Sequence, residues 1–234
     1  MGPCLNAGPC FHFFVCSIIT VWKFEERRDL VDDPSKFLNI TEYNILMYAV
    51  ELLFLTECAI WLFTSGGSSR HSRRSSDKGT VWLVMIAWIC SFMAGAYFRS
   101  QGVSEFMRGW LLPHFFYYIG IIFIILGVII RCTAVLTLRK SFTLSVQTEA
   151  GQHLIKTGLY RFVRNPAYTG SIISLLGVSF AYRHILGAIF TLFLCLVCYG
   201  IRINVEEKAL KAQFGGEFEQ YCIRTRYRLI PGIY

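Results

Sequence analysis

Residues able to do chemistry gather in two polar stretches near the carboxyl terminus of the chain. The first runs from Ser141 to Gly170 and is dense in side chains that form hydrogen bonds. Gly158 permits a turn, and Pro166 disfavours helical backbone at Asn165 but fits the first turn of a helix, so we predict that a helix begins at Asn165-Pro166. Composition alone favours an ordinary loop at the membrane surface, with three interfacial anchors. These would be Tyr160, Arg161 and Arg164.

The second stretch runs from Arg202 to Tyr221. Arg202 and Glu206 are four positions apart, so they share one face of a predicted helix that continues from an apolar segment. The pair could bind a charged ligand, or it could be a surface ion pair worth about 0.5 kcal/mol or less. Gly215-Gly216 should end this helix. Three tyrosines are as consistent with interfacial anchors as with ligands: Tyr221, Tyr227 and Tyr234.

Apolar helices must position both stretches. The chain has 234 residues, 54% of them hydrophobic and only 16% charged, and a helix of about 20 apolar residues crosses a bilayer. We therefore predict an all-α integral membrane protein with five to six transmembrane helices, followed by a cytosolic helix near the carboxyl terminus. The last two apolar segments are short and separated only by Tyr182 to His184, which predicts a helical hairpin. The six segments are 5–22, 41–64, 80–98, 114–138, 167–181 and 185–201.

The distribution of basic residues predicts the orientation of these helices. The net charge is +8, which in a soluble protein would suggest nucleic acid, but here Lys and Arg flank apolar segments. Most of them lie in the stretches 65–79 and 139–166 and in the tail that starts at Arg202. The positive-inside rule places those stretches, and with six spans both termini, in the cytosol. We therefore expect no nucleic-acid partner.

Cysteine and glycine patterns exclude several other classes. Most of the nine cysteines lie in apolar segments, where they act as small hydrophobic residues. The CxxC of Cys195 and Cys198 lies within an apolar segment, and no second CxxC completes a zinc site. We expect no metal. A glycine-rich GxGxxG motif after a strand is also absent, which disfavours a soluble methyltransferase with a Rossmann fold.

The two stretches together resemble the isoprenylcysteine carboxyl methyltransferase family, within a superfamily that includes phospholipid methyltransferases. The resemblance rests on H-L-I-K-T-G-L-Y-R-F-V-R-N-P-A-Y-T-G from His153 to Gly170, then R-x-x-x-E-E from Arg202 to Glu207, then Phe214-Gly215. It covers about residues 131 to 233. Two motifs in order, with a hairpin between them, make a specific pattern. The family usually has histidine where Asn165 stands, and the histidine that usually heads the first motif is Gln152 here, with His153 one place later.

The resemblance implies S-adenosyl-L-methionine as methyl donor and the carboxyl-terminal prenylated cysteine of a protein as acceptor. It assigns the acceptor, and hence catalysis, to Arg202 and Glu206. The implied cofactor-binding residues are Gln147, Gln152, His153, Leu154, Ile155, Tyr160, Asn165, Pro166, Ala167 and Tyr168. Residues 1–138 would form a bundle of four spans and residues 139–234 the methyltransferase region. In a eukaryote we expect the endoplasmic reticulum membrane, with membrane lipid as a further partner.

Chemistry and charge suggest how such a site would work. A carboxylate acceptor is ionised at neutral pH and needs no general base. Arg202 would bind it through a guanidinium–carboxylate pair, and Glu206 would hold Arg202 or face the sulfonium. The alternatives are a lipid or phospholipid amine N-methyltransferase, an NADPH-dependent sterol-type reductase, and a membrane scaffold that has lost catalysis.

Overall fold

The computed structural model describes residues 40–65, 81–100, 110–143, 154–230 and 232, and these are almost entirely helical. Contacts divide the chain into Met1–Ile45 and Leu46–Tyr234, and every side-chain contact discussed below lies in the second unit. The predicted segment 5–22 and the Ser/Arg-rich stretch 65–79 lie outside the described residues, apart from Ser65. The elements, in chain order, are α2 (Ile40–Ser65), α4 (Val81–Ser100), α6 (Phe115–Thr143), the short 3-10 helix η2 (Gly158–Arg161), α7 (Pro166–Ala181), α8 (Ile185–Phe214) and α9 (Gly216–Arg224).

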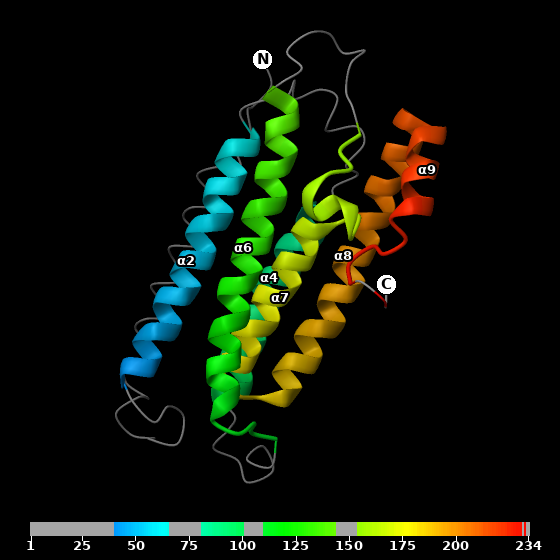
Figure 1. Ribbon diagram of the computed structural model, residues 1–234. Coiled ribbons are helices and arrows are strands. Elements are labelled where there is room, and N and C mark those ends of the chain that lie inside the picture. Colours follow the sequence, from blue (N-terminus) through cyan, green and yellow to red (C-terminus); the bar gives the residue numbers. More distant parts are fainter. Residues whose placement is uncertain (1–39, 66–80, 101–109, 144–153, 231, 233–234) are drawn as a thin grey trace, which may run out of the picture. The chain divides into compact units, whose positions relative to one another are not determined.

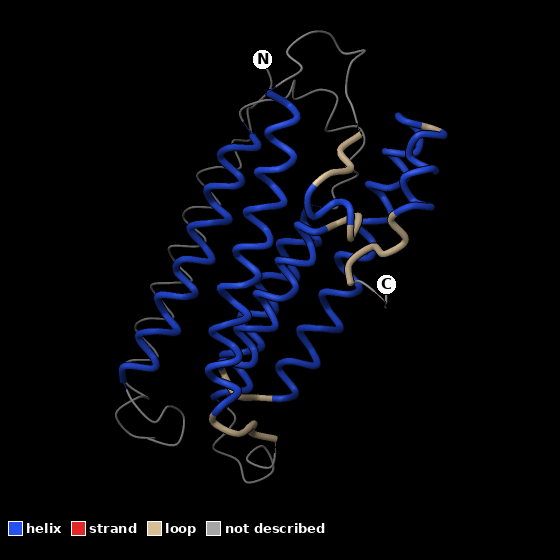
Figure 2. Tube along the Cα trace, viewed as in Figure 1, coloured by secondary structure: helices blue, strands red, loops and turns tan. Residues whose placement is uncertain are grey.

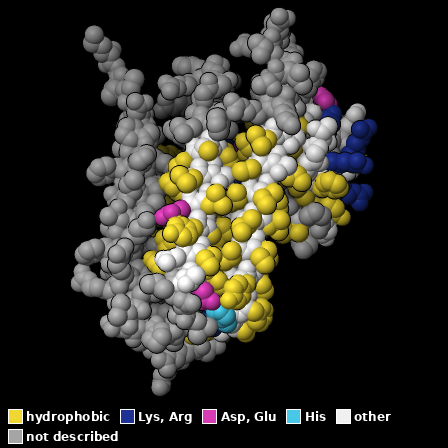
Figure 3. Space-filling model, turned by 60° about the vertical axis from the view of Figure 1, so that its left-hand side comes forward, with side chains coloured by type: hydrophobic (Ala, Val, Ile, Leu, Met, Phe, Trp, Pro, Cys, Tyr) yellow, Lys and Arg dark blue, Asp and Glu magenta, His cyan; other side chains and the backbone are white. Residues whose placement is uncertain are grey.

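Three of these helices are long and apolar enough to cross a membrane, at Thr41–Ile60, Phe115–Leu138 and Ile185–Phe214. Two shorter apolar helices cover Trp82–Ala94 and Pro166–Ala181. Large hydrophobic side chains such as Ile122, Ile129 and Phe193 are more than half exposed, and Figure 3 shows hydrophobic side chains spread over the helices. Such a surface is suited to lipid rather than water. The prediction of an all-α membrane protein is therefore confirmed at this level.

Helices α6 and α7 approach each other very closely because small residues line their contact. A Cβ atom built on Gly127 would lie 2.5 Å from the Gly170 carbonyl oxygen, and one on Gly120 would lie 2.6 Å from the Gly177 carbonyl oxygen. Ser174 fits into the same contact, and its hydroxyl donates to the Ile124 carbonyl at 3.3 Å. Close approach of this kind, through small residues and interhelical hydrogen bonds, is typical of membrane helices.

The predicted hairpin is present, and its turn is anchored. Arg183 has a φ of +58°, a left-handed backbone that non-glycine residues adopt at some cost. The segment before α6 holds this turn: the Leu112 nitrogen donates to the Arg183 carbonyl at 2.8 Å, and the Ile185 nitrogen donates to the Trp110 carbonyl at 3.2 Å. The hairpin brings the start of α7 back beside the later part of α8 (Figure 2).

The second arm of the hairpin is longer than its apolar part. Helix α8 continues for 30 residues, through Arg202 and Glu206, and ends at Phe214. Gly215 ends it with a φ of +51°, as the Gly-Gly pair predicted. A core of buried side chains from α4, α7, α8 and the carboxyl-terminal segment holds α8 in place. It contains Ala87, Ile172, Leu175, Cys195, Cys198, Tyr199, Ile203 and Leu229.

Candidate active site

Three side chains from α7 and α8 contact one another, and we call them the Tyr–Arg–Glu triad. Arg202 forms an ion pair with Glu206, with 2.7 Å between Nη2 and Oε1. The Tyr168 hydroxyl donates to the same oxygen of Glu206 at 2.8 Å and accepts from Arg202 Nε at 3.2 Å. Arg202 is 15% exposed and Glu206 35% exposed. The i, i+4 pair expected from the sequence therefore forms, and Tyr168 joins it from a different helix.

The start of α7 determines where Tyr168 lies. Asn165 occupies the N-cap position and Pro166 the first turn, as the sequence predicted. The Asn165 carbonyl accepts from the nitrogens of Tyr168 and Thr169, both at 3.1 Å. One turn into the helix, the Tyr168 ring packs against Tyr199 with a centroid distance of 5.2 Å.

A buried ion pair connects α2 to the start of the same helix. Arg131 of α6 pairs with Glu57 of α2, with 2.5 Å between Nη2 and Oε2. The Nη1 atom of Arg131 also donates to the Ala167 carbonyl at 3.1 Å. Arg131 lies on the amino-terminal side of the boundary expected at residue 138, yet it contacts the residue next to Tyr168. It thus links the helical bundle to the site.

Glu207, next to the triad, forms a second charged group. It lies between two arginines, 3.1 Å from Arg164 Nε and 2.9 Å from Arg228 Nη2. Arg164, an interfacial anchor in the alternative interpretation of the sequence, is instead largely buried in this ion pair. These contacts attach the segment after α9 to the segment before α7.

Backbone and hydroxyl groups strengthen that attachment. The backbone nitrogens of Arg164 and Asn165 donate to the carbonyls of Tyr227 and Arg228 at 2.9 and 3.0 Å. The Asn165 side chain also donates to the Arg228 carbonyl, at 3.3 Å. The Tyr221 hydroxyl donates to the Tyr160 carbonyl at 2.8 Å. Tyr221 is thus a buried structural residue rather than an interfacial anchor.

The remaining predicted cofactor residues fall into two groups. Leu154 and Ile155 are partly buried in the irregular segment before η2, and Tyr160 within η2 is buried. Burial raises the pKa values of the Tyr160 and Tyr221 hydroxyls, so both stay protonated at neutral pH. The other three predicted residues, Gln147, Gln152 and His153, lie outside the described residues.

Sequence reasoning did not assign roles to Glu57, Arg131, Glu207 or Arg228. A signal did exist for the first pair, because an ionisable residue inside an apolar segment is costly and usually has a partner and a function. Glu207 ends the R-x-x-x-E-E motif, but the motif did not indicate its partners, and no signal distinguished Arg228 from other surface charges. Their partners are distant in the sequence.

The exposed side of the triad suits a cationic ligand. Both contacts of Glu206 use Oε1, and Oε2 forms no hydrogen bond or ion pair with any residue in the described ranges. An available carboxylate oxygen of this kind would attract a sulfonium or ammonium group. Among the same residues no cluster of His, Cys, Asp and Glu is suited to hold a metal ion.

Comparison with known proteins relates the site to a family. A sequence model of the phospholipid methyltransferase family matches residues 115–217. A probable protein-S-isoprenylcysteine O-methyltransferase of Oryza sativa subsp. indica is 36% identical over 108 residues, which are 45% of this chain and 56% of that protein. The predicted resemblance is confirmed. The chain spans about half the length of the curated relatives it matches.

Two further proteins are similar to this chain, one in its structure and one in its sequence. A solved eukaryotic intramembrane Ras methyltransferase, an isoprenylcysteine carboxyl methyltransferase, matches with a TM-score of 0.56 and 22% identity over 87% of this chain and 70% of that one. A Delta(14)-sterol reductase of Gallus gallus is 34% identical over 92 residues, which are 38% of this chain and 14% of that protein. The chain is therefore similar in fold to this solved methyltransferase, and part of its sequence is also similar to a reductase.

Proposed function

We propose that this protein transfers a methyl group from S-adenosyl-L-methionine to the carboxyl-terminal carboxylate of a prenylated cysteine. The observation that carries the proposal is the Tyr–Arg–Glu triad, which holds the guanidinium of Arg202 between a phenol and a carboxylate at the end of an apolar helix. The similarity of residues 115–217 to membrane methyltransferases supports the choice of reaction.

Arg202 is the residue that binds the acceptor in this proposal. A carboxylate is ionised at neutral pH, so the site needs no base and acts by positioning and by electrostatic stabilisation. Glu206 and Tyr168 fix the orientation of the Arg202 guanidinium, whose several nitrogen–hydrogen groups allow it to bind more than one acceptor at a time. Arg202 and Glu206 are therefore the proposed catalytic residues.

The residues around the triad fit the proposed cofactor. S-adenosyl-L-methionine would supply an electrophilic methyl group on a positively charged sulfur. The available Oε2 of Glu206 provides a negative group for that charge. The residues proposed to hold the cofactor are Gln147, Gln152, His153, Leu154, Ile155, Tyr160, Asn165, Pro166, Ala167 and Tyr168.

The membrane supplies the other substrate. We propose six spans with the active site facing the cytosol, four of them within residues 1–138, and residues 139–234 as the methyltransferase region, completed by Arg131. In a eukaryote the membrane would be that of the endoplasmic reticulum. A prenyl chain dissolved in the bilayer would bring its cysteine carboxylate to the triad without leaving the lipid.

One observation favours a second function. The matching family model is that of phospholipid methyltransferases, so a lipid amine is an alternative acceptor. Such an acceptor is protonated at neutral pH and would need a base, and as a cation it would leave the guanidinium of Arg202 without a group to bind. The carboxylate acceptor fits the triad better.

The test is a methyl-transfer assay with a farnesylated cysteine analogue and labelled S-adenosyl-L-methionine. A methyl ester releases volatile methanol in alkali, whereas an N-methyl product does not. Arg202→Ala should lower turnover by about 10²- to 10³-fold, the usual effect of removing a group that stabilises transition-state charge. Lys208→Ala, on the exposed side of the same helix, should retain full turnover. Wild-type turnover in Arg202→Ala would overturn the role of Arg202, and an alkali-stable product would favour the amine.

A further inference from the structure

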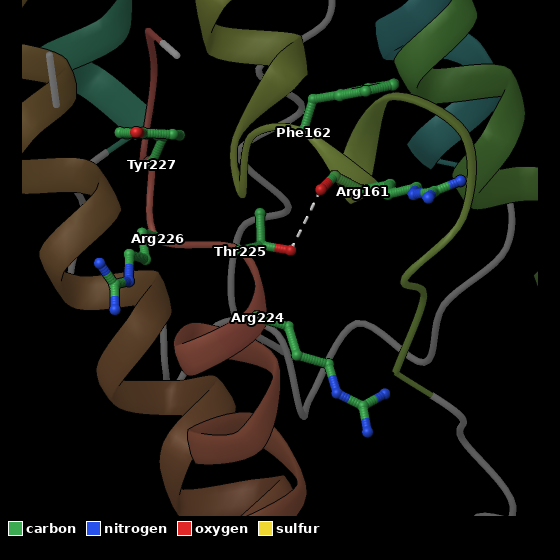
Figure 4. A pocket seen from close by; sticks show the side chains of 6 residues that line it. All are labelled: Arg161, Phe162, Arg224, Thr225, Arg226 and Tyr227. Atoms are coloured by element: carbon green, nitrogen blue, oxygen red, sulfur yellow. Dashed lines mark hydrogen bonds between the residues drawn. The ribbon is translucent and has the colours of Figure 1, made fainter. Parts of the chain in front are cut away.

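A hollow of about 260 Å³ lies where the segment after α9 meets η2, and we call it the arginine hollow. Its lining consists of Arg161, Phe162, Arg224, Thr225, Arg226 and Tyr227. In Figure 4 the side chains of Arg161 and Arg224 extend to one side of the hollow and that of Arg226 to the other. The hollow is separate from the Tyr–Arg–Glu triad, none of whose residues lines it.

The three arginines of the hollow bring three positive charges close together. All three are exposed, and none forms an ion pair with another residue of the described ranges. The neighbouring acids are already engaged, since Glu217 pairs with Lys156 at 2.7 Å and Glu219 pairs with Lys211 at 2.8 Å. Glu207 is likewise held between its own two arginines. The hollow therefore attracts an anion.

The backbone that carries these arginines is well supported. The Thr225 hydroxyl donates to the Arg161 carbonyl at 3.3 Å (Figure 4), and the Thr169 hydroxyl donates to the Leu229 carbonyl at 2.7 Å. Together with the contacts of Tyr221 and Arg164, these bonds hold both sides of the hollow. Guanidinium groups on a fixed backbone lose less conformational freedom when they bind a ligand.

Apolar side chains beside the hollow indicate what kind of anion it binds. Phe162, which lines the hollow, is 62% exposed, and Ile223, the residue before Arg224, is 72% exposed. Phe162 lies four positions before Pro166, where the apolar helix α7 begins. We expect the start of an apolar helix to lie where the membrane meets the lipid head groups. Exposed apolar groups next to basic ones are characteristic of segments that lie in the interface of an anionic membrane.

We propose that the arginine hollow binds the phosphate of an anionic phospholipid. Arg161 and Arg224 form charge-assisted hydrogen bonds to the phosphodiester, Arg226 adds to the local positive potential, and Phe162 and Ile223 lie against the first carbons of the acyl chains. The proposal concerns lipid binding only and does not depend on methyl transfer.

The experiment is a binding titration of the full-length protein in a nonionic detergent, followed by microscale thermophoresis. The probes are dioctanoyl phosphatidylglycerol, dioctanoyl phosphatidylcholine and inorganic phosphate. We expect phosphatidylglycerol to bind more tightly than either of the others. Arg161→Gln/Arg224→Gln should weaken that binding by roughly tenfold or more, given the contribution of each arginine near a charged membrane surface. Phe162→Ser should weaken it less.

The matched control compares two single variants. Lys208→Gln removes one positive charge from the exposed side of α8, and Arg224→Gln removes one positive charge from the hollow. Lys208→Gln should change the affinity for phosphatidylglycerol by less than about twofold, because diffuse surface charge is screened at moderate salt. Equal losses in these two single variants would overturn the proposal in favour of diffuse attraction. Equal affinity for phosphatidylcholine, or for inorganic phosphate, would also overturn it. Melting temperature monitors folding, and the two single variants provide the test if the double variant unfolds.

Discussion

The contact between α6 and α7 and the polar end of α7 and α8 are held together by opposite means. The first uses glycine and serine, which let two backbones approach until no space remains for a Cβ atom. The second uses arginines, carboxylates and hydroxyls whose partners come from distant parts of the chain. Only the second can respond to a charged ligand. Arg131 belongs to both, since it lies on α6 and reaches the start of α7.

The largest effect should come from breaking the ion pair between Glu57 and Arg131, which joins α2 to α6. Glu57→Leu would leave Arg131 buried without this counter-ion, and removing one partner of a buried pair costs about 3–5 kcal/mol. Glu57→Leu should therefore lower the stability of the detergent-solubilised protein strongly, as measured by thermal or denaturant unfolding. Leu55→Ala, at a position of the same helix that is 64% exposed, serves as the comparison.

A double variant sharpens the meaning of that result. Glu57→Leu/Arg131→Met removes both charges and should recover part of the stability, because no charge of this pair is left unpaired. The rate of methyl transfer by the double variant should be below that of the wild-type protein, since the methionine side chain cannot donate a hydrogen bond to the Ala167 carbonyl. Full recovery of turnover would show that Arg131 acts only through its charge balance with Glu57.

The next effect tests the close contact between α6 and α7. Gly127→Ala would place a methyl group 2.5 Å from the Gly170 carbonyl oxygen and directly against the Ser174 hydroxyl. Overpacking costs about 1–3 kcal/mol, so the melting temperature should fall. At Gly200 of α8, a Cβ atom meets nothing within 4 Å. Gly200→Ala should therefore have an unchanged or slightly raised melting temperature, and an equal fall in both variants would contradict the packing argument.

The smallest effect tests the hydrogen bonds at the polar end. Tyr221→Phe removes the buried bond to the Tyr160 carbonyl, worth about 1 kcal/mol. Hydrogen exchange in residues 158–165 should become faster, because the segment after α9 holds them less tightly. The hydroxyl of Tyr227 has no hydrogen-bond partner in the described part of the chain, so Tyr227→Phe is the control and should leave exchange unchanged.

The sequence by itself determined the features that depend on near neighbours. Hydropathy predicted the apolar helices, Asn165-Pro166 the start of α7, and Gly215-Gly216 the end of α8. The pair of Arg202 and Glu206 followed from helical spacing alone, because side chains four positions apart share a face. The resemblance to methyltransferases could also be seen in the sequence, because each of its two motifs is a continuous run of residues.

Only the tertiary structure decided how the charges are paired. Tyr168 reaches Arg202 because the hairpin brings α7 beside α8, and Glu57 reaches Arg131 across 74 positions of sequence. Glu206 and Glu207 are adjacent, yet one joins Arg202 and Tyr168 while the other joins Arg164 and Arg228. Successive helical residues point about 100° apart, so adjacent carboxylates face different partners. Which partner each carboxylate meets depends on how the helices pack, and the composition of the sequence does not predict that packing.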